Sequence, residues 1–123
     1  MTEKKEVYKC SVCGNIVEIL HVGAGQLVCC NKPMDQQTEN TVDATTEKHV
    51  PIITKTEDGA TIRVGSVDHP MDDDHHIEWI EATIGKQSIR KYLAIGEDPV
   101  MKTCGVVTSA RAYCNLHGLW KSE

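Results

Sequence analysis

Much of the chain after residue 49 consists of five or six short runs rich in apolar residues, separated at regular spacing by polar, turn-forming residues. Short runs bounded by turn signals in this way predict β-strands. Asp58-Gly59 is a strong signal for a hairpin between two of the runs. No stretch keeps a helical apolar period and no internal repeat is present, so the pattern predicts an antiparallel sandwich or barrel. The expected strands are Val50–Lys55, Ala60–Val67, His75–Ile84, Ser88–Ile95, Val100–Val107 and Ser109–Cys114.

The first third of the chain has short strand-like runs between glycine turns, a pattern typical of β-hairpins. From Asp35 to Lys48 the chain is polar and rich in threonine, as expected of a linker or an exposed extended segment. We therefore predict an N-terminal domain over 1–36, a linker or extended segment over 37–48 and a second domain over 49–123. The expected strands of the first domain are Glu6–Lys9, Ile16–Leu20 and Gln26–Val28.

Composition narrows the class of protein. The 123 residues include 13 basic and 18 acidic side chains, a formal charge of −5, which argues against nucleic acid or an anionic membrane as a partner. Two Trp, three Tyr and no Phe leave little bulky apolar mass, and small chains of this kind usually need a disulfide or a metal ion as a staple. No apolar run is long enough to span a bilayer, and the first residues lack a secretory signal, so we expect a cytoplasmic protein.

Four of the six cysteines form a compact group in the predicted N-terminal domain. Disulfides are rare in a reducing cytoplasm, so clustered cysteines indicate metal ligands before bridges or free thiols. Cys10 and Cys13 form a C-x-x-C motif, and the adjacent pair Cys29-Cys30 follows after fifteen intervening residues. Four thiolates from two hairpin tips suit tetrahedral iron or zinc, and the spacing does not choose between them. Neighbouring side chains point apart, so we expect a distorted tetrahedron.

A second group of candidate ligands lies outside these cysteines. Cys114 and His117 are three residues apart and close enough to share an ion on one loop. Taken singly, a histidine is more often a surface or capping residue than a ligand. Four imidazoles with one thiolate would exceed the tetrahedral demand of structural zinc and suit an iron that keeps a position open. Cys104 is expected to be a small core residue in a strand. The other candidate imidazoles are those of His49, His69, His75 and His76.

Five strings of residues together closely resemble the desulfoferrodoxin family, the two-iron superoxide reductases, nearly from end to end. This resemblance implies a desulforedoxin-like N-terminal iron-binding domain, followed by an immunoglobulin-like β-sandwich that carries the catalytic iron. It also implies a homodimer that reduces superoxide to hydrogen peroxide without dismutation, and a rubredoxin-like electron donor. The strings are Tyr8-Lys9-Cys10-x-x-Cys13-Gly14-Asn15, Cys29-Cys30-Asn31, Glu47-Lys48-His49-Val50-Pro51, His69-Pro70-Met71 and Tyr113-Cys114-Asn115-Leu116-His117-Gly118-Leu119-Trp120.

The resemblance assigns roles to residues of both sites. Glu47 matches a carboxylate that can occupy the sixth position of the second iron, and Lys48 matches a cation beside that opening. His76 stands where the family commonly has an aromatic residue, which leaves open which member of the His75-His76 pair is the ligand. The first iron would be bound by Cys10, Cys13, Cys29 and Cys30, and the second by His49, His69, His75, His117 and the axial Cys114.

Two other functions are compatible with the same residues. The chain could be a non-enzymatic iron protein for electron transfer, in which the His/Cys site is only structural. It could also be a zinc-knuckle interaction module, with four zinc-binding cysteines and surface histidines. Two irons per chain would support the superoxide reductase, whose biological role is detoxification in oxidative stress, and one zinc per chain would support the module.

Overall fold

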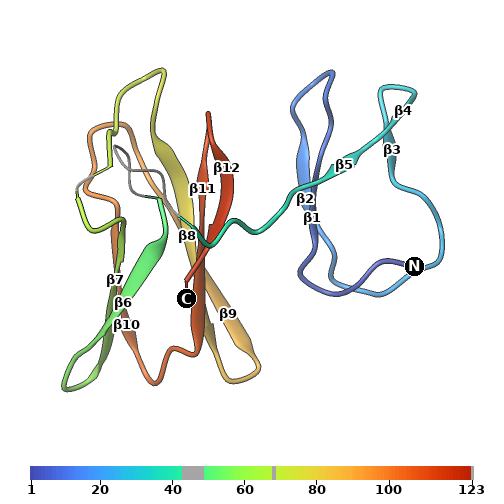
Figure 1. The fold of residues 1–123 in the computed structure, drawn as a ribbon. Helices are drawn as coiled ribbons and strands as arrows, with labels where there is room; N and C mark the ends of the chain where they lie inside the picture. The colour runs from blue at the N-terminus through green and yellow to red at the C-terminus, as the bar shows by residue number, and fades with distance from the viewer. Residues whose placement is uncertain (43–48, 68, 123) are drawn as a thin grey trace. The chain divides into compact units, whose positions relative to one another are not determined.

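The computed structural model describes residues 1–42, 49–67 and 69–122, which contain twelve β-strands and no helix. No helix in these ranges has the length and apolar character that crossing a membrane requires. The chain divides into two compact units, Met1–Gln37 and Thr38–Glu123 (Figure 1). The all-β class predicted from the short runs and the turns between them is confirmed.

The first unit is built from two small antiparallel sheets, ordered β2-β1-β5 and β3-β4. Its core is small, with Val7 and Cys10 both 2% exposed. A core of this size gains little from burial alone, which fits the expectation of a metal staple. The strands are β1 (Val7–Lys9), β2 (Ile16–Glu18), β3 (Val28–Cys29), β4 (Lys32–Pro33) and β5 (Asp35–Gln36).

The second unit is a sandwich of two antiparallel sheets, ordered β10-β7-β6 and β12-β11-β8-β9. Figure 1 shows the two sheets of this unit face to face. All their pairings are antiparallel, as the immunoglobulin-like expectation requires. The strands are β6 (Pro51–Lys55), β7 (Gly59–Val64), β8 (Ile77–Ile84), β9 (Gln87–Tyr92), β10 (Val100–Cys104), β11 (Ser109–Cys114) and β12 (Gly118–Lys121).

The core of the sandwich lies between these sheets. β7 and β10 contribute Ile62, Val64 and Met101, and the inward positions of β8 and β11 contribute small or aliphatic side chains. Alternation along β11 puts Ala110, Ala112 and Cys114 on this inner face, so the core row of the strand ends in a thiol. The inward residues of β8 and β11 are Ile77, Ile80, Ala82, Ala110, Ala112 and Cys114.

The strand predicted over Val100–Val107 ends earlier, at Cys104. Cys104 pairs with Gly59, where β7 begins after the hairpin turn, so no residue of that partner strand lies opposite Val106. Val106 is 66% exposed. The expectation that Cys104 is a core residue was wrong, because it lies in β10 but is exposed.

The segment predicted as a linker is described only in part. The N–H of Gln37 donates to the carbonyl of Val7 at 2.7 Å, within the first unit. Asn40 belongs to the second unit, where its N–H donates to the carbonyl of Leu119 at 3.0 Å and its carbonyl accepts the N–H of Lys121 at 2.9 Å. Residues 43–48 of the predicted linker lie outside the described residues.

Candidate metal centres

The four thiols of the first unit converge from two hairpin tips. Cys10 and Cys13 lie in the turn between β1 and β2, while Cys29 ends β3 and Cys30 follows it. The Sγ atoms of Cys13 and Cys29 are 3.6 Å apart, and those of Cys29 and Cys30 are 4.0 Å apart. The four sulfur atoms lie within 4.8 Å of one another. A set of four soft donors at this spacing fits one mononuclear iron or zinc ion.

A hairpin turn explains how two adjacent cysteines face the same point. Cys30 has a φ of +53° and Asn31 a φ of +61°. These two residues connect β3 to β4, and positive φ at both central positions is the mark of a type I′ turn. In an extended chain the side chains of Cys29 and Cys30 would point to opposite faces. The left-handed backbone returns the Cys30 side chain to the side of Cys29.

Hydrogen bonds set unequal proton affinities in this group. The backbone N–H groups of Cys13 and Val12 each donate to Cys10 Sγ at 3.4 Å, which lowers the pKa of Cys10 to about 6. Hydrogen bonding with the Cys13 thiol, followed by those of Cys10 and Cys29, raises the pKa of Cys30 to about 12. A cation that binds all four sulfurs must therefore displace protons.

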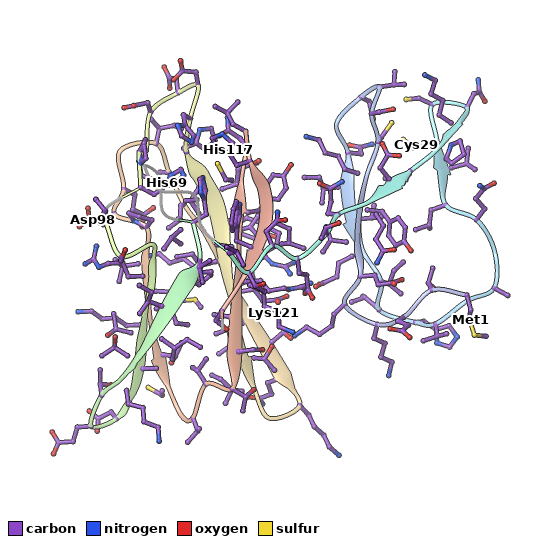
Figure 2. The ribbon with its side chains drawn as sticks, viewed as in Figure 1. Met1, Cys29, His69, Asp98, His117 and Lys121 are labelled. Atoms are coloured by element: carbon purple, nitrogen blue, oxygen red, sulfur yellow. The ribbon has the colours of Figure 1, made fainter. Side chains whose placement is uncertain are left out.

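Four imidazoles of the second unit form a square. In the order His49, His69, His75, His117 and back to His49, the centroids of neighbouring rings are 4.6, 4.7, 5.0 and 4.8 Å apart. Each ring meets the next at 65–80°, and the diagonal from His49 to His75 is 6.3 Å. His49 Nε2 and His117 Nδ1 approach to 3.1 Å. Figure 2 shows His69 and His117 at the same end of the sandwich.

The thiol of Cys114 lies close to opposite corners of this square. Its Sγ is 3.7 Å from His69 Nε2 and 3.8 Å from His117 Nδ1. Four imidazoles and one thiolate would supply five ligands to an ion, which would leave a sixth position for another ligand. Ligand atoms of His49, His69, His75 and Cys114 all lie within 4.8 Å of one another. This donor set fits a single iron ion.

A β-bulge at the end of β11 helps to place Cys114. Tyr113 pairs with Trp79, but Cys114 pairs with Ile77, so Glu78 is an extra residue on β8. Bulges commonly redirect side chains beside functional sites. Cys114 is fully buried, whereas His117, at the end of the turn that follows, is exposed. The group therefore reaches from the core to the surface.

Both candidate centres share one feature of the local backbone. Cys10-x-x-Cys13 is followed by Gly14 with a φ of +84°, and Cys114-x-x-His117 is followed by Gly118 with a φ of +85°. A glycine adopts this left-handed conformation at little cost. In each case the chain turns back immediately after the second ligand.

Neighbouring groups orient two of the imidazoles. His69 Nδ1 lies 2.8 Å from the carbonyl of Pro70, which can only accept, so this nitrogen carries the proton and Nε2 is left for an ion. The indole of Trp120 stacks on the His49 ring, with centroids 4.5 Å apart and planes at 15°. Its Nε1–H donates to the carbonyl of His117 at 3.2 Å.

The structure separates His75 from His76. His75 belongs to the square, whereas His76 Nδ1 contacts the carbonyl of Asp72 at 2.9 Å. Cys104 belongs to neither group among the described residues. Sequence reasoning did not give Asn115 a role, although its position between Cys114 and His117 was a signal. Glu47 and Lys48 lie outside the described residues.

An all-β chain with a tetrathiolate group and a separate imidazole–thiolate group is a non-haem metalloprotein of a two-site class. Residues 2–36 match the family described as "Desulfoferrodoxin, N-terminal domain", and residues 41–123 match that described as "Desulfoferrodoxin". The chain belongs to the desulfoferrodoxin family, and its two donor groups fit two mononuclear iron centres.

Similar proteins cover the whole length of the chain. The desulfoferrodoxin of Syntrophotalea carbinolica is 55% identical over 127 residues, with 100% of this chain and 99% of the relative covered. That of Nitratidesulfovibrio vulgaris is 50% identical over 125 residues, with the same coverage of 100% and 99%. The crystal structure of the superoxide reductase from Treponema pallidum has a TM-score of 0.80 at 25% identity, and the match covers 96% of this chain and 97% of that one.

Proposed function

We propose that this chain is a superoxide reductase, which reduces superoxide by one electron to hydrogen peroxide without dismutation. The observation that carries the proposal is the square of four imidazoles around the Cys114 thiol. The similarity to the Treponema pallidum superoxide reductase over nearly the whole chain supports the same activity.

The proposal includes the ligands of both sites. The first iron is held by the four sulfurs of Cys10, Cys13, Cys29 and Cys30. The second would be held by nitrogens of His49, His69, His75 and His117 and by the thiolate of Cys114. The burial of His49 and His69, 2% and 4% exposed, argues against the surface histidines of a zinc-knuckle module.

The donors of the second site are suited to an anionic substrate. When bound, the iron supplies the electron that superoxide takes up. Because the imidazoles are neutral, the donor set contributes only the negative charge of Cys114 and leaves a divalent ion with net positive charge. An anion is then attracted to the site although the chain carries a formal charge of −5. Two protons complete hydrogen peroxide, and the exposed edge at His117 gives solvent a route to supply them.

Glu47 and Lys48 are the residues we propose beside the open sixth position. They precede the proposed ligand His49 directly in the sequence, and the resemblance to the family supports their roles. Lys48 adds a positive charge that attracts superoxide, and Glu47 offers a carboxylate to the oxidised site.

The first centre is proposed to transfer electrons. A tetrathiolate iron suits this task, and the exposure of Cys13 and Cys30 gives a rubredoxin-like donor protein access to its sulfurs. A non-enzymatic electron-transfer protein would also have this centre. Only the superoxide reductase reacts with superoxide, so that reaction distinguishes the two functions.

The biological setting is part of the same proposal. We propose a cytoplasmic homodimer with an iron-binding domain over 1–36, a connecting segment over 37–48 and a catalytic domain over 49–123. The resemblance to the family supports the homodimer. The formal charge of −5 supports an assembly that binds neither nucleic acid nor a membrane surface.

Anaerobic mixing of the reduced, iron-loaded protein with superoxide tests the function. We expect one hydrogen peroxide per second-site iron oxidised, with no oxygen released. Oxygen release in step with peroxide would indicate dismutation, and iron that stays reduced would indicate a non-enzymatic protein. A Cys114→Ser variant is the matched control, because it removes the anionic ligand and should lose the iron or the reaction.

A further inference from the structure

Two separate loops carry ligands of the second candidate centre, and the side chain of Asn115 joins them. One loop, residues 115–117, connects β11 to β12; Cys114 is the last residue of β11 before it, and His117 is its last residue. The other, residues 72–76, precedes β8 and carries His75. Asn115 Oδ1 accepts the N–H of His76 at 2.9 Å, and Asn115 Nδ2 donates to the carbonyl of Asp74 at 3.0 Å. The two hydrogen bonds fall on either side of His75 in the sequence.

The main chain of Asn115 adds a third hydrogen bond. Its N–H donates to the carbonyl of His76 at 3.1 Å, so the His76 peptide groups are held from both directions. The orientation of the side-chain amide follows from its partners. A backbone N–H can only donate and a carbonyl can only accept, which fixes Oδ1 toward His76 and Nδ2 toward Asp74.

The loop that Asn115 holds has its own internal hydrogen bonds. The N–H of Asp72 donates to the carbonyl of His75 at 2.9 Å, and the N–H of His75 donates back to Asp72 at 3.3 Å. His76 Nδ1 lies 2.9 Å from the same Asp72 carbonyl and must be its protonated, donating nitrogen. These hydrogen bonds restrain the backbone of the loop, so contacts at Asp74 and His76, on either side of His75, also restrain the position of His75.

We propose that Asn115 is a positioning residue of the second metal centre, whose carboxamide fixes His75 relative to Cys114 and His117. This inference rests on the proposed ligand set. An asparagine meets the requirement because it is short and presents an acceptor and a donor together. An aspartate keeps the acceptor for His76 but has no donor for Asp74, and an alanine has neither.

Because Asn115 is partly exposed, its effect on the metal site can be distinguished from an effect on the stability of the fold. Its side chain is half-buried and the Asp74 contact is exposed, so water can replace these hydrogen bonds when the amide is removed. The cost to the free energy of unfolding is then small. The cost to the metal site is larger, because groups that orient metal ligands typically change metal affinity by about 10–100-fold.

The test compares iron release from full-length, iron-loaded variants. Ferrous protein is mixed with an excess chelator, and the second centre is followed by Mössbauer spectroscopy, which distinguishes an imidazole-rich iron from a tetrathiolate iron. The variants are Asn115→Ala, Asn115→Asp and the control Thr108→Val. Thr108 lies just before β11, at the opposite end of the strand from Asn115, and its Oγ1 donates to the carbonyl of Thr83 at 3.2 Å.

We expect Asn115→Ala to release second-site iron at least about tenfold faster than the unmodified chain, with an altered spectrum. The release rate of Asn115→Asp should lie between those of Asn115→Ala and the unmodified chain. Thr108→Val should release iron at the rate of the unmodified chain. The thermal midpoints of Asn115→Ala and Thr108→Val should be similar. An unchanged release rate and spectrum in Asn115→Ala would overturn the inference. The inference would also be overturned if both Asn115→Ala and Thr108→Val released iron faster, in proportion to their loss of thermal stability.

Peroxide yield is measured on the same preparations. An unmodified chain that holds iron but yields no peroxide would contradict the proposed function, while the comparison of release rates would still be readable. An Asn115→Ala variant that behaves as the unmodified chain would contradict the positioning role and leave the function standing.

Discussion

The indole of Trp120 lies almost parallel to the imidazole of His49, with ring centroids 4.5 Å apart. The same indole donates its N–H to the carbonyl of His117. One side chain thus contacts the imidazole of His49 through its face and the main chain of the neighbouring ligand residue, His117, through its edge. Trp120 is inward-facing on β12, so the packing of the sandwich is linked directly to the geometry of the site.

Replacing Trp120 by phenylalanine should weaken the site without unfolding the chain. Phenylalanine keeps a ring over His49 but loses the hydrogen bond to the His117 carbonyl, which is worth about 1 kcal/mol, or roughly a fivefold faster release of iron. Trp79→Phe is the matched control, because Trp79 is also 8% exposed but stacks on Tyr113 on the other face of the sheet. Equal iron release from the two variants would contradict the role given to Trp120.

The fold class follows from the sequence, because short runs between turn-forming residues are a local signal of each strand. The prediction of Ser109–Cys114 matches β11, where small apolar residues alternate with Arg111 and Tyr113. β12 was not predicted, since Gly118–Lys121 is too short to show a period, and only pairing with β11 makes it a strand. Where a strand ends depends on where its partner strand ends, and this cannot be seen in the sequence. The run Val100–Val107 therefore predicted a strand that includes Val106, although β10 ends at Cys104.

The candidate ligands could also be found from residue type and spacing, but their geometry could not. Asn31 is a residue type that adopts positive φ readily, but nothing in the sequence gives the positive φ of Cys30 that brings the two thiols together. Neither does the sequence distinguish His75 from His76. The separation arises from hydrogen bonds between segments about forty residues apart, such as that from His76 to Asn115.

A buried ion network on the outer face of the sandwich should make a large contribution to stability. Glu81 is 1% exposed and binds Arg111 at 2.7 Å and Arg90 at 2.6 Å. Glu81→Gln removes the charge that these arginines share and should lower the free energy of unfolding by about 3 kcal/mol. Urea unfolding followed by tryptophan fluorescence measures this, since Trp79 and Trp120 both lie in the second unit.

Glu97→Gln provides the comparison for Glu81. Glu97 pairs with Lys91 at 3.1 Å, but both side chains are more than a third exposed. An exposed pair contributes about 0–1 kcal/mol, so this variant should be close to the unmodified chain. If Glu81→Gln and Glu97→Gln lower the free energy of unfolding equally, burial does not explain the contribution of the Glu81 network to stability.

Metal binding at the first centre should weaken as the pH falls. At neutral pH Cys10, with a pKa of about 6, is mostly thiolate, whereas Cys30, with a pKa of about 12, keeps its proton. The pKa of Cys29 is also raised, first by hydrogen bonding with Cys13. Loading therefore releases at least the protons of Cys29 and Cys30, so the apparent affinity should change by at least roughly 100-fold per pH unit near neutrality.

Competition between the metal-free protein and a chelator for Cd²⁺ measures this dependence over a pH series. Below pH about 6 the proton that Cys10 binds should make the dependence steeper. A Cys30→Ser variant serves as the control, because it removes one of the protons to be displaced and should show a shallower slope. An affinity that does not change with pH would contradict the proton balance derived from these thiols.

Lys48→Ala should slow the second-order reaction of the ferrous protein with superoxide. Lys48 precedes the proposed ligand His49 directly in the sequence, and we propose that its positive charge attracts the anion to the site. Salt screens such a charge, so the variant should also show a weaker dependence of the rate on ionic strength. Lys86→Ala is the control, because Lys86 follows β8 at its far end from His75 and is exposed. Glu47→Ala removes a negative charge and should leave the rate unchanged or slightly higher, with its effect appearing in the spectrum of the ferric site. Stopped-flow rates over a salt series decide the matter, and a Lys48→Ala rate and salt slope equal to those of Lys86→Ala would exclude electrostatic attraction by Lys48.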